Sequence, residues 1–167
     1  MALADKAKLA AVIGPAATVL AVVLTGSNEG VSLKPYNDKL GANVLTVCYG
    51  DTEVPMRRYT LDECKQLLAD RLADYATAVR NSTLDFDTLT DGQKVAAVDF
   101  AYNLGVQTYK SSTLRVMYGN KQFPEACEQF LRYKYTGSPR RDCSLAESNC
   151  SGLMKRRRAE RAACRGE

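Results

Sequence analysis

"SNEGVSLKPYND", residues 27–38, carries two carboxylates, Glu29 and Asp38, with eight residues between them. Glu29 comes almost directly after an uncharged stretch, residues 9–26, which reads "LAAVIGPAATVLAVVLTG". Paired carboxylates are the natural tool for breaking glycosidic bonds, because one can act as an acid and the other as a base. A single acidic residue is usually a solvated surface charge, so the rest of the chain must support the pair.

The composition restricts the chemistry that the chain can perform. Its 167 residues suit one domain, and 46% of them are hydrophobic, which is enough to form a core. The chain contains no histidine, which excludes Ser-His-Asp and Cys-His nucleophilic sites and the usual catalytic zinc sites. We therefore expect a hydrolase that works with carboxylates and uses no metal or cofactor.

Six cysteines are present, and none of them forms a C-x-x-C motif. An even number without zinc-ribbon spacing favours three disulfides formed in an oxidising compartment. The alternative is a set of buried free thiols in a cytosolic protein. The cysteines are Cys48, Cys64, Cys127, Cys143, Cys150 and Cys164.

The apolar stretch at residues 9–26 allows three interpretations. As a helix it would reach about 27 Å, close to the roughly 30 Å of a hydrocarbon core, but Ala, Gly and Pro make it weakly hydrophobic. A cleaved signal peptide, a permanent anchor and a buried core helix all fit in part. We favour a segment that first inserts into a membrane and later packs on the domain. In the packed form Pro15 should kink or end the helix.

The following third of the chain predicts a small sheet and two helices. Residues 44–54 are rich in β-branched and aromatic residues and indicate strands. A capping box and an apolar face predict a helix over residues 60–79, followed by a polar linker at residues 81–89. A second capping box at residues 90–93 opens an almost entirely apolar helix that should be buried and end at Gly105.

The C-terminal third predicts further helices. Residues 111–120 and 123–137 each indicate a helix, residues 138–150 a loop, and Ser151 the start of a terminal helix. The basic run at residues 155–167 could be a nucleic-acid arm. Apolar residues interrupt it, so we favour the charged solvent face of a helix and expect no nucleic-acid partner.

Several of these segments, taken in order, resemble the phage-type lysozymes. "EGVSLKPYND" resembles their catalytic stretch, and "TVCYGDT", "DECKQLL", "FAYNLG", "SSTL" and "GLMKRR" continue the resemblance to the end of the chain. It implies an α+β lysozyme-like fold, with a mostly helical C-terminal lobe, a small antiparallel sheet lobe and a cleft between them. The lambdoid endolysins of this family imply a signal-anchor-release segment at residues 1–27 and a catalytic domain at residues 28–167.

The resemblance also implies roles for individual residues. Glu29 would be the general acid, Asp38 the general base or the charge that stabilises the transition state, and Thr46 the residue that holds the attacking water. Thr46 follows Asp38 after seven residues, whereas the family pattern has five, and Asp51 stands where relatives commonly have His. Asn103, Arg156 and Arg157 are candidate substrate contacts, although the arginines could instead be surface charges or packing residues. The pairs Cys48–Cys64 and Cys127–Cys164 follow from the resemblance, which leaves Cys143 and Cys150 to pair within an inserted loop.

The implied function is that of an endolysin, an inverting muramidase that hydrolyses the β-1,4 bond between N-acetylmuramic acid and N-acetylglucosamine in peptidoglycan. We expect a monomer that is held inactive on the periplasmic side of the host inner membrane, in transient contact with lipid, and is then released to the periplasm. The alternative is a membrane-anchored wall-binding or pore-forming lysis protein without catalysis. Cleavage of chitin or chitosan uses the same chemistry and is a closer alternative.

Overall fold

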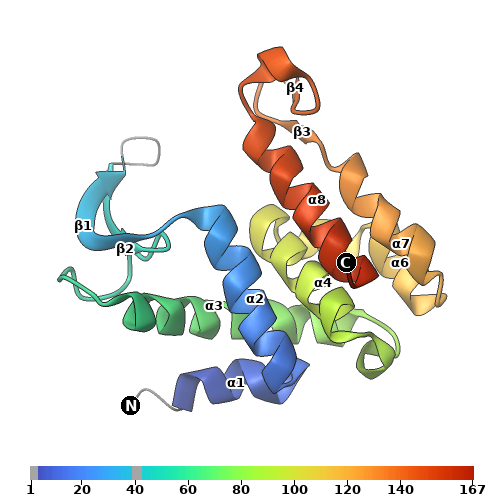
Figure 1. The fold of residues 1–167 in the computed structure, drawn as a ribbon, viewed down its shortest axis with the longest axis horizontal. Coiled ribbons are helices and arrows are strands. Elements are labelled where there is room, and N and C mark those ends of the chain that lie inside the picture. Colours follow the sequence, from blue (N-terminus) through green and yellow to red (C-terminus); the bar gives the residue numbers. More distant parts are fainter. Residues whose placement is uncertain (1–3, 39–42) are drawn as a thin grey trace.

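The computed structural model describes residues 4–38 and 43–167 of the chain, and their fold is mostly helical (Figure 1). Two short antiparallel ribbons accompany the helices. The elements are α1 (Ala4–Ile13), α2 (Pro15–Glu29), β1 (Ser32–Asp38), β2 (Val44–Cys48), α3 (Leu61–Ser82), α4 (Asp91–Leu104), α5 (Val106–Lys110), α6 (Thr113–Gly119), α7 (Phe123–Gln129), β3 (Tyr135–Thr136), β4 (Arg141–Asp142) and α8 (Ser151–Arg165), with 3-10 turns at Phe86–Thr88, Phe130–Arg132 and Ala146–Ser148.

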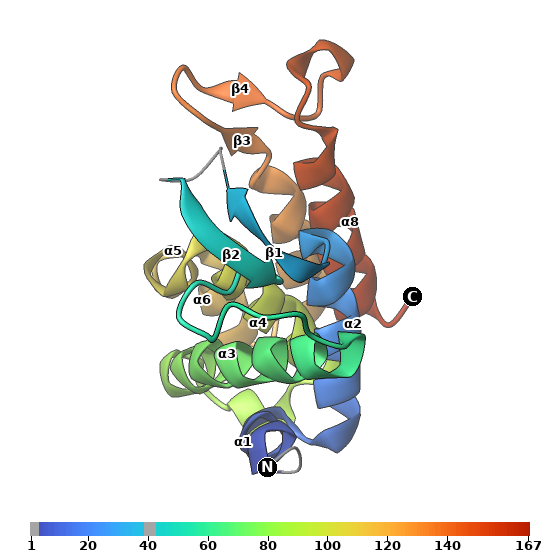
Figure 2. The ribbon, with the colours of Figure 1, turned by 90° about the vertical axis from the view of Figure 1, so that its left-hand side faces the viewer.

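The elements form two lobes, which confirms the expected α+β architecture. The β1–β2 ribbon stands apart from the helical body, and the long helix α3 runs between the two (Figure 1). In Figure 2 the ribbon is seen in front of the helices. Residues 44–54 had predicted both strands, but β1 lies upstream and β2 covers only the start of that range. Sequence patterns missed β1 because Pro35 and Asp38 are poor strand residues. The register shift between Ser32 and Tyr36 accommodates the proline. Asp38 is therefore the last residue of a strand.

The apolar N-terminal stretch forms two helices that meet at a sharp bend. Pro15 begins α2, which confirms the predicted break in the helix at this residue. The two helices lie at 109° to each other. In the described part of the chain no single helix is long and apolar enough to cross a membrane, but Ala7–Ile13 and Pro15–Glu29 meet that test as a bent pair. The boundary expected between residues 27 and 28 falls inside α2.

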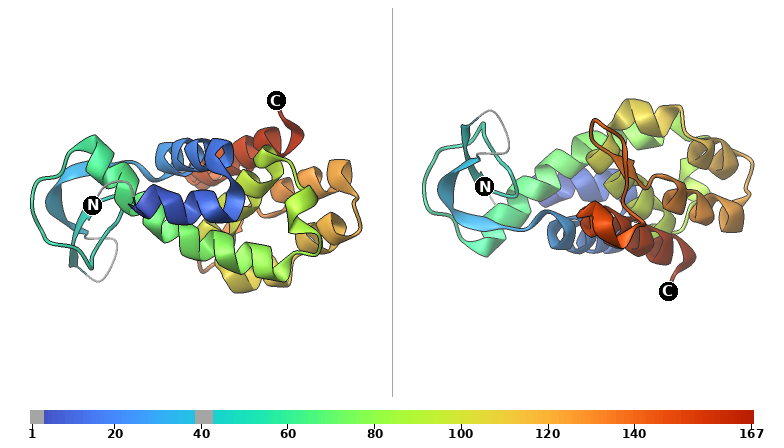
Figure 3. Two further views of the ribbon diagram at one scale, coloured as in Figure 1. Left: turned by 90° about the horizontal axis from the view of Figure 1, so that it is seen from below. Right: turned by 90° about the horizontal axis from the view of Figure 1, so that it is seen from above.

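Both N-terminal helices pack against the helical body. Helix α1 lies along α3 (Figure 3), and α2 contacts both α3 and α4. The residues that face inward are apolar or small, and all are nearly inaccessible to solvent. The apolar ones are Leu9, Ile13, Ala17, Ala21 and Val22, and the small polar residues Thr18 and Thr25 are buried beside them. The packed form expected for this segment is thus the form that the structure describes.

The two predicted capping boxes are confirmed. Thr60 with Glu63 opens α3, and Thr90 with Gln93 opens α4. Helix α4 ends before Gly105 and is buried along most of its length, so it forms the centre of the helical body. The expected polar linker at residues 81–89 is instead partly core, because the side chains of Phe86 and Leu89 are buried beside a 3-10 turn.

The C-terminal region departs from the predicted pattern in two places. The helix expected at residues 123–137 ends early, and β3 occupies the end of that range. Strand β4 lies in the expected loop and pairs with β3 to form a small hairpin. The terminal helix begins at Ser151 as predicted. Its charged run is not simply a solvent face, because Arg156, Arg157 and Glu160 are all buried.

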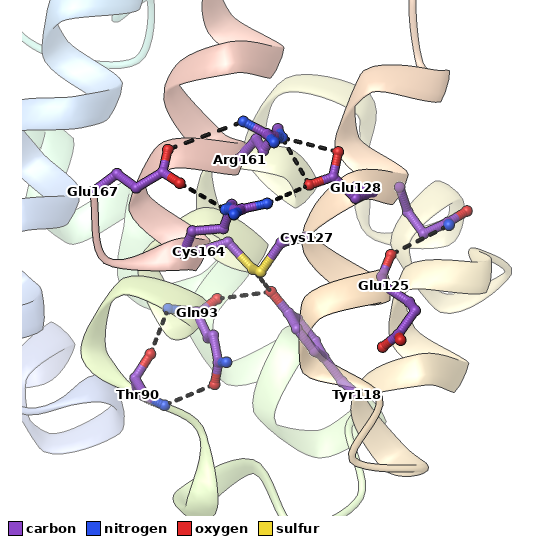
Figure 4. The surroundings of a disulfide bond; sticks show 11 residues. Thr90, Gln93, Tyr118, Glu125, Cys127, Glu128, Arg161, Cys164 and Glu167 are labelled. Atoms are coloured by element: carbon purple, nitrogen blue, oxygen red, sulfur yellow. Dashed lines mark hydrogen bonds and ion pairs between the residues drawn. A yellow bond between two sulfur atoms is a disulfide. The ribbon is translucent and has the colours of Figure 1, made fainter.

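Three disulfides join the pairs that the resemblance implied. Cys48–Cys64 ties β2 to α3, Cys127–Cys164 ties α7 to α8, and Cys143–Cys150 closes the segment that leads into α8. Figure 4 shows the second of these beside an ion pair between Arg161 and Glu128, whose atoms lie 2.9 Å apart. The disulfides therefore fasten both lobes and the C-terminal hairpin.

Candidate active site

Glu29 is the last residue of α2 and projects toward α8. The helix stops there because Gly30 has a φ of +70°, which glycine adopts without strain. The Glu29 carboxylate accepts a hydrogen bond from Nη1 of Arg156. Only 27% of the Glu29 side chain and 6% of the Arg156 side chain are exposed. The Glu29 carboxyl group is thus bound by a buried arginine on one side and open to solvent on the other.

A buried cluster holds Arg156. Its Nε and Nη2 donate to the two carboxylate oxygens of Asp99 in α4, at 2.9 and 2.8 Å. The Thr25 hydroxyl in α2 donates to Asp99 Oδ1 at 2.7 Å. Burial acts to lower the pKa of Arg156, but Asp99 and Glu29 outweigh it and raise that pKa, so the guanidinium stays charged. Helices α2, α4 and α8 therefore meet at one ion-paired cluster.

A second layer of polar residues lies deeper in the body. Nη2 of Arg157 contacts Glu160 at 2.7 Å and Asn103 at 2.8 Å, and Arg157 and Glu160 are fully inaccessible. Burial raises the pKa of Glu160 well above its ordinary range, and the charge of Arg157 opposes that change. Arg157 therefore packs in the interior of the helical body against Glu160 and Asn103, which fits the packing alternative.

Two hollows meet at Glu29. The first, of about 380 Å³, lies on the ribbon side and is lined by Asp38, Tyr36 and Tyr49 as well as Glu29. The second, of about 320 Å³, lies on the helical side. Its lining residues are Asn28, Glu29, Asn103, Gly152, Leu153 and Arg156. The structure thus places Glu29 and Asp38 around one hollow between the lobes, where a cleft was expected, and it places Asn103 and Arg156 around the adjoining one.

Thr46 lies on the same face of the ribbon as Asp38. Asp38 is paired with Val44, and Tyr36 with Thr46, so alternate residues of the two strands share a face. The Thr46 side chain is buried, and its hydroxyl donates to the Val44 carbonyl at 2.9 Å. Thr46 therefore lies diagonally across the ladder from Asp38, directly opposite Tyr36, and it is not among the residues that line the two hollows. Its hydroxyl oxygen can still accept a hydrogen bond.

Asp51 and Arg71 hold the turn that follows β2. Nε of Arg71 lies 3.3 Å from Asp51, and its Nη2 donates to the Tyr49 carbonyl at 2.7 Å. The Asp51 side chain in turn accepts from the Tyr49 backbone N–H. Burial raises the pKa of Asp51, and Arg71 partly offsets that rise. Asp51, which stands where the family commonly has His, thus pairs with Arg71 and holds Tyr49, a residue that lines the first hollow.

The fold and this site define a lysozyme-type hydrolase. The chain belongs to the phage lysozyme family, whose family profile matches residues 26–160. It is 35% identical over 164 residues to the SAR-endolysin of Bacteriophage PS34, covering 93% of this chain and 90% of the relative. It is 34% identical over 167 residues to the SAR-endolysin of Enterobacteria phage P21, covering 95% and 93%.

Solved structures with the same fold include a variant of P22 lysozyme, with a TM-score of 0.71, 23% identity and coverage of 86% of this chain and 94% of that one. The active form of the P1 phage endolysin Lyz gives a TM-score of 0.64 at 21% identity, with 95% and 91% covered. These two likenesses establish the fold.

Sequence reasoning missed two members of the site, Asp99 and Thr25. Asp99 carried a usable signal: it is the one charged residue in the apolar run from Val95 to Leu104, and a buried carboxylate requires partners. Thr25 carried no signal beyond its place at the end of the apolar stretch. Among the described residues, no group of three or more His, Cys, Asp or Glu side chains could hold a metal ion.

Proposed function

We propose that this protein is a phage endolysin, a muramidase that hydrolyses the β-1,4 bond between N-acetylmuramic acid and N-acetylglucosamine. The observation that carries the proposal is the Glu29 carboxyl group, fixed by buried Arg156 at the junction of two hollows, with Asp38 lining the same hollow. The family supports peptidoglycan as the substrate, and the names of the relatives support the role in lysis.

In the proposed reaction Glu29 donates its proton to the glycosidic oxygen as the bond from that oxygen to the anomeric carbon breaks. Arg156 then stabilises the carboxylate that remains on Glu29. Asp38 removes a proton from a water molecule, and that water attacks the anomeric carbon from the opposite face, which inverts the configuration. Thr46, on the same face of the ribbon as Asp38, is proposed to orient the water.

A cell-wall clearing assay tests the proposal. Glu29→Gln preserves the size of the side chain but removes the proton donor, so the rate of clearing of purified bacterial cell walls should fall by about 10²-fold or more. Glu125→Gln is the matched control, because Glu125 lies exposed on α7 and its loss should leave the rate unchanged. Clearing by Glu29→Gln at the wild-type rate would instead favour a non-catalytic wall-binding or pore-forming protein.

Residues 1–27 are proposed to act as a signal-anchor-release segment. The relatives are named SAR-endolysins, and the bent pair of α1 and α2 has the length and composition of a membrane span. Val19, Leu20 and Val23 remain 64%, 49% and 61% exposed on the packed α2, so this helix keeps an apolar outer face. The protein would first be held on the periplasmic side of the inner membrane and then be released as a monomer.

Membrane insertion would keep the enzyme inactive through geometry. Glu29 is the last residue of α2, so a form with α2 in the bilayer separates Glu29 from Arg156 and Asp99 on the helical body. None of the six cysteines lies in residues 9–26, so the release cannot depend on a thiol in this segment. Deletion of residues 1–26 should abolish targeting and also impair activity in solution. Full activity of the deletion variant would show that the segment is an export signal only.

Two sets of substitutions separate retention in lipid from packing. Ala11 and Ala16 are exposed in the packed form, whereas Ala17 and Ala21 are buried. Leucine at the exposed pair should increase the membrane-bound fraction while any released protein keeps its specific activity. Leucine at the buried pair should increase retention equally, and it should also lower the activity and stability of the released protein through overpacking. Equal release by wild type and both variants would refute the anchor.

A further inference from the structure

Asp99 is a buried carboxylate in the middle of the central helix. It is 1% exposed and accepts three hydrogen bonds, one from Thr25 and two from Arg156. A carboxylate at this depth is tolerated only when donors replace its lost water. The role of this buried charge therefore follows from its two partners, Thr25 and Arg156.

Asp99 determines the direction in which Arg156 points. The guanidinium is planar, and two of its nitrogens are bound side-on to the two oxygens of Asp99. This bidentate geometry fixes the plane of the group. The third nitrogen, Nη1, then points at Glu29. The position of the proposed acid is therefore set by a carboxylate that lies behind Arg156 and does not line either hollow at Glu29.

Thr25 connects the same cluster to α2. It lies four residues before Glu29, so the two side chains are on the same face of the helix, one turn apart. Thr25 donates a hydrogen bond to Asp99, and Glu29 accepts one from Arg156. Helix α2 therefore contacts both members of the Asp99–Arg156 ion pair. Thr25 is completely buried. A shift or rotation of α2 would break both contacts together.

We propose that Asp99 and Thr25 are positioning residues for Glu29: Asp99 orients Arg156 against the acid, and the Thr25 hydroxyl locks the last turn of α2 in register with Asp99. This inference rests on the proposed role of Glu29 as the acid. The hydrogen bond from Thr25 to Asp99 thereby couples the packing of α2 against α4 to the proposed role of Glu29.

The test compares hydroxyl removal at two buried threonines of α2. Thr25→Val keeps the shape of the side chain and removes the bond to Asp99. Thr18→Val is the matched control, because the Thr18 hydroxyl is also buried but donates only to the Gly14 carbonyl of the same helix turn. Activity is measured on soluble glycan fragments of peptidoglycan with the purified full chain, and thermal unfolding is recorded for each variant.

Thr25→Val should lower kcat about 10-fold or more, because small displacements of a catalytic group are costly, and should leave KM within about twofold. Thr25→Ser, which restores the hydroxyl, should recover most of kcat, and Thr18→Val should stay close to wild type. Asp99→Asn should lower kcat further. Because Asp99→Asn could also unfold the core, the threonine pair decides the result.

The outcomes separate this inference from the proposed function. If Glu29→Gln is inactive while Thr25→Val keeps wild-type kcat, the positioning role is wrong and the proposed acid stands. If Thr18→Val and Thr25→Val lose kcat equally, or Thr25→Ser fails to recover it, the effect is general packing and the inference is overturned. If Glu29→Gln keeps full activity, the proposed function itself fails.

Discussion

Replacing Gly92 with alanine should destabilise the protein, although Gly→Ala in a helix usually does the opposite. Gly92 is the second residue of α4, where a Cβ would lie 2.0 Å from the backbone oxygen and 3.0 Å from the carbonyl carbon of Ala163 in α8. Ordinary contacts begin near 3.4 Å, so the two helix backbones would have to separate by more than about 1 Å, and close packing resists such a shift.

The size of the effect follows from two opposing terms. Alanine gains up to about 1 kcal/mol in helix propensity, whereas overpacking costs about 1–3 kcal/mol and more where backbone must move. We expect a net loss of about 1–3 kcal/mol, which lowers the Tm by roughly 2–4 °C per kcal/mol for a chain of this size. Thermal unfolding followed by circular dichroism, with the disulfides intact, measures this loss.

Gly152 supplies the control. It is the second residue of α8, and a Cβ there would meet no atom within 4 Å. Gly152→Ala should therefore leave the Tm unchanged or raise it by an amount equivalent to less than about 1 kcal/mol. If Gly92→Ala proves as stable as Gly152→Ala, the close approach of α4 to α8 is wrong, and with it the geometry that brings Asp99 to Arg156.

Two further predictions concern stability. The disulfides Cys127–Cys164, Cys48–Cys64 and Cys143–Cys150 span sequence separations of 37, 16 and 7 residues, so the chain-entropy model gives stabilisations of about 4, 3 and 2 kcal/mol. Replacing both cysteines of a pair with serine should therefore lower the Tm most for Cys127–Cys164 and least for Cys143–Cys150. A reversed order would refute the entropic ranking. Hydrogen bonding to Lys134 lowers the pKa of Asp142 to about 2, so the stability that the ionised Asp142 contributes is present above about pH 4 and is lost as the pH falls toward 2. Between these pH values the Tm of Asp142→Asn should fall less steeply than the Tm of wild type. Identical slopes would count against the ion pair.

Local sequence chemistry was sufficient to predict several elements. The two capping boxes, Pro15 at the start of α2 and Gly105 after α4 each act within one helix turn, so their neighbours in sequence are their neighbours in space. Strand β1 was not predictable from its own residues, because its pairing with β2, with a register shift between Ser32 and Tyr36, overrides poor propensity. Strand β3 likewise replaces the end of a stretch with a helical pattern, because it pairs with β4.

The site shows the same limit. Glu29 and Asp38 were found through a motif, and the structure places both around one hollow. Packing of Arg157 was one of the alternatives that the sequence left open, but the burial of Glu160 was not predicted, since a charged run on a terminal helix normally faces water. The two residues pair with each other, and Arg157 also contacts Asn103. Asp99 could have been found, because a single carboxylate in an apolar helix requires a partner elsewhere in the chain.

The most direct test of the proposed muramidase is the identity of the sugar ends that it releases. Purified peptidoglycan is digested with wild type and with Glu29→Gln, and the fragments are reduced with borohydride and analysed by mass spectrometry. We predict reduced N-acetylmuramic acid ends for wild type and about 10²-fold fewer for Glu29→Gln. Reduced N-acetylglucosamine ends, anhydro ends formed without water, cleaved stem peptides with intact glycan, or equal yields from both proteins would contradict it.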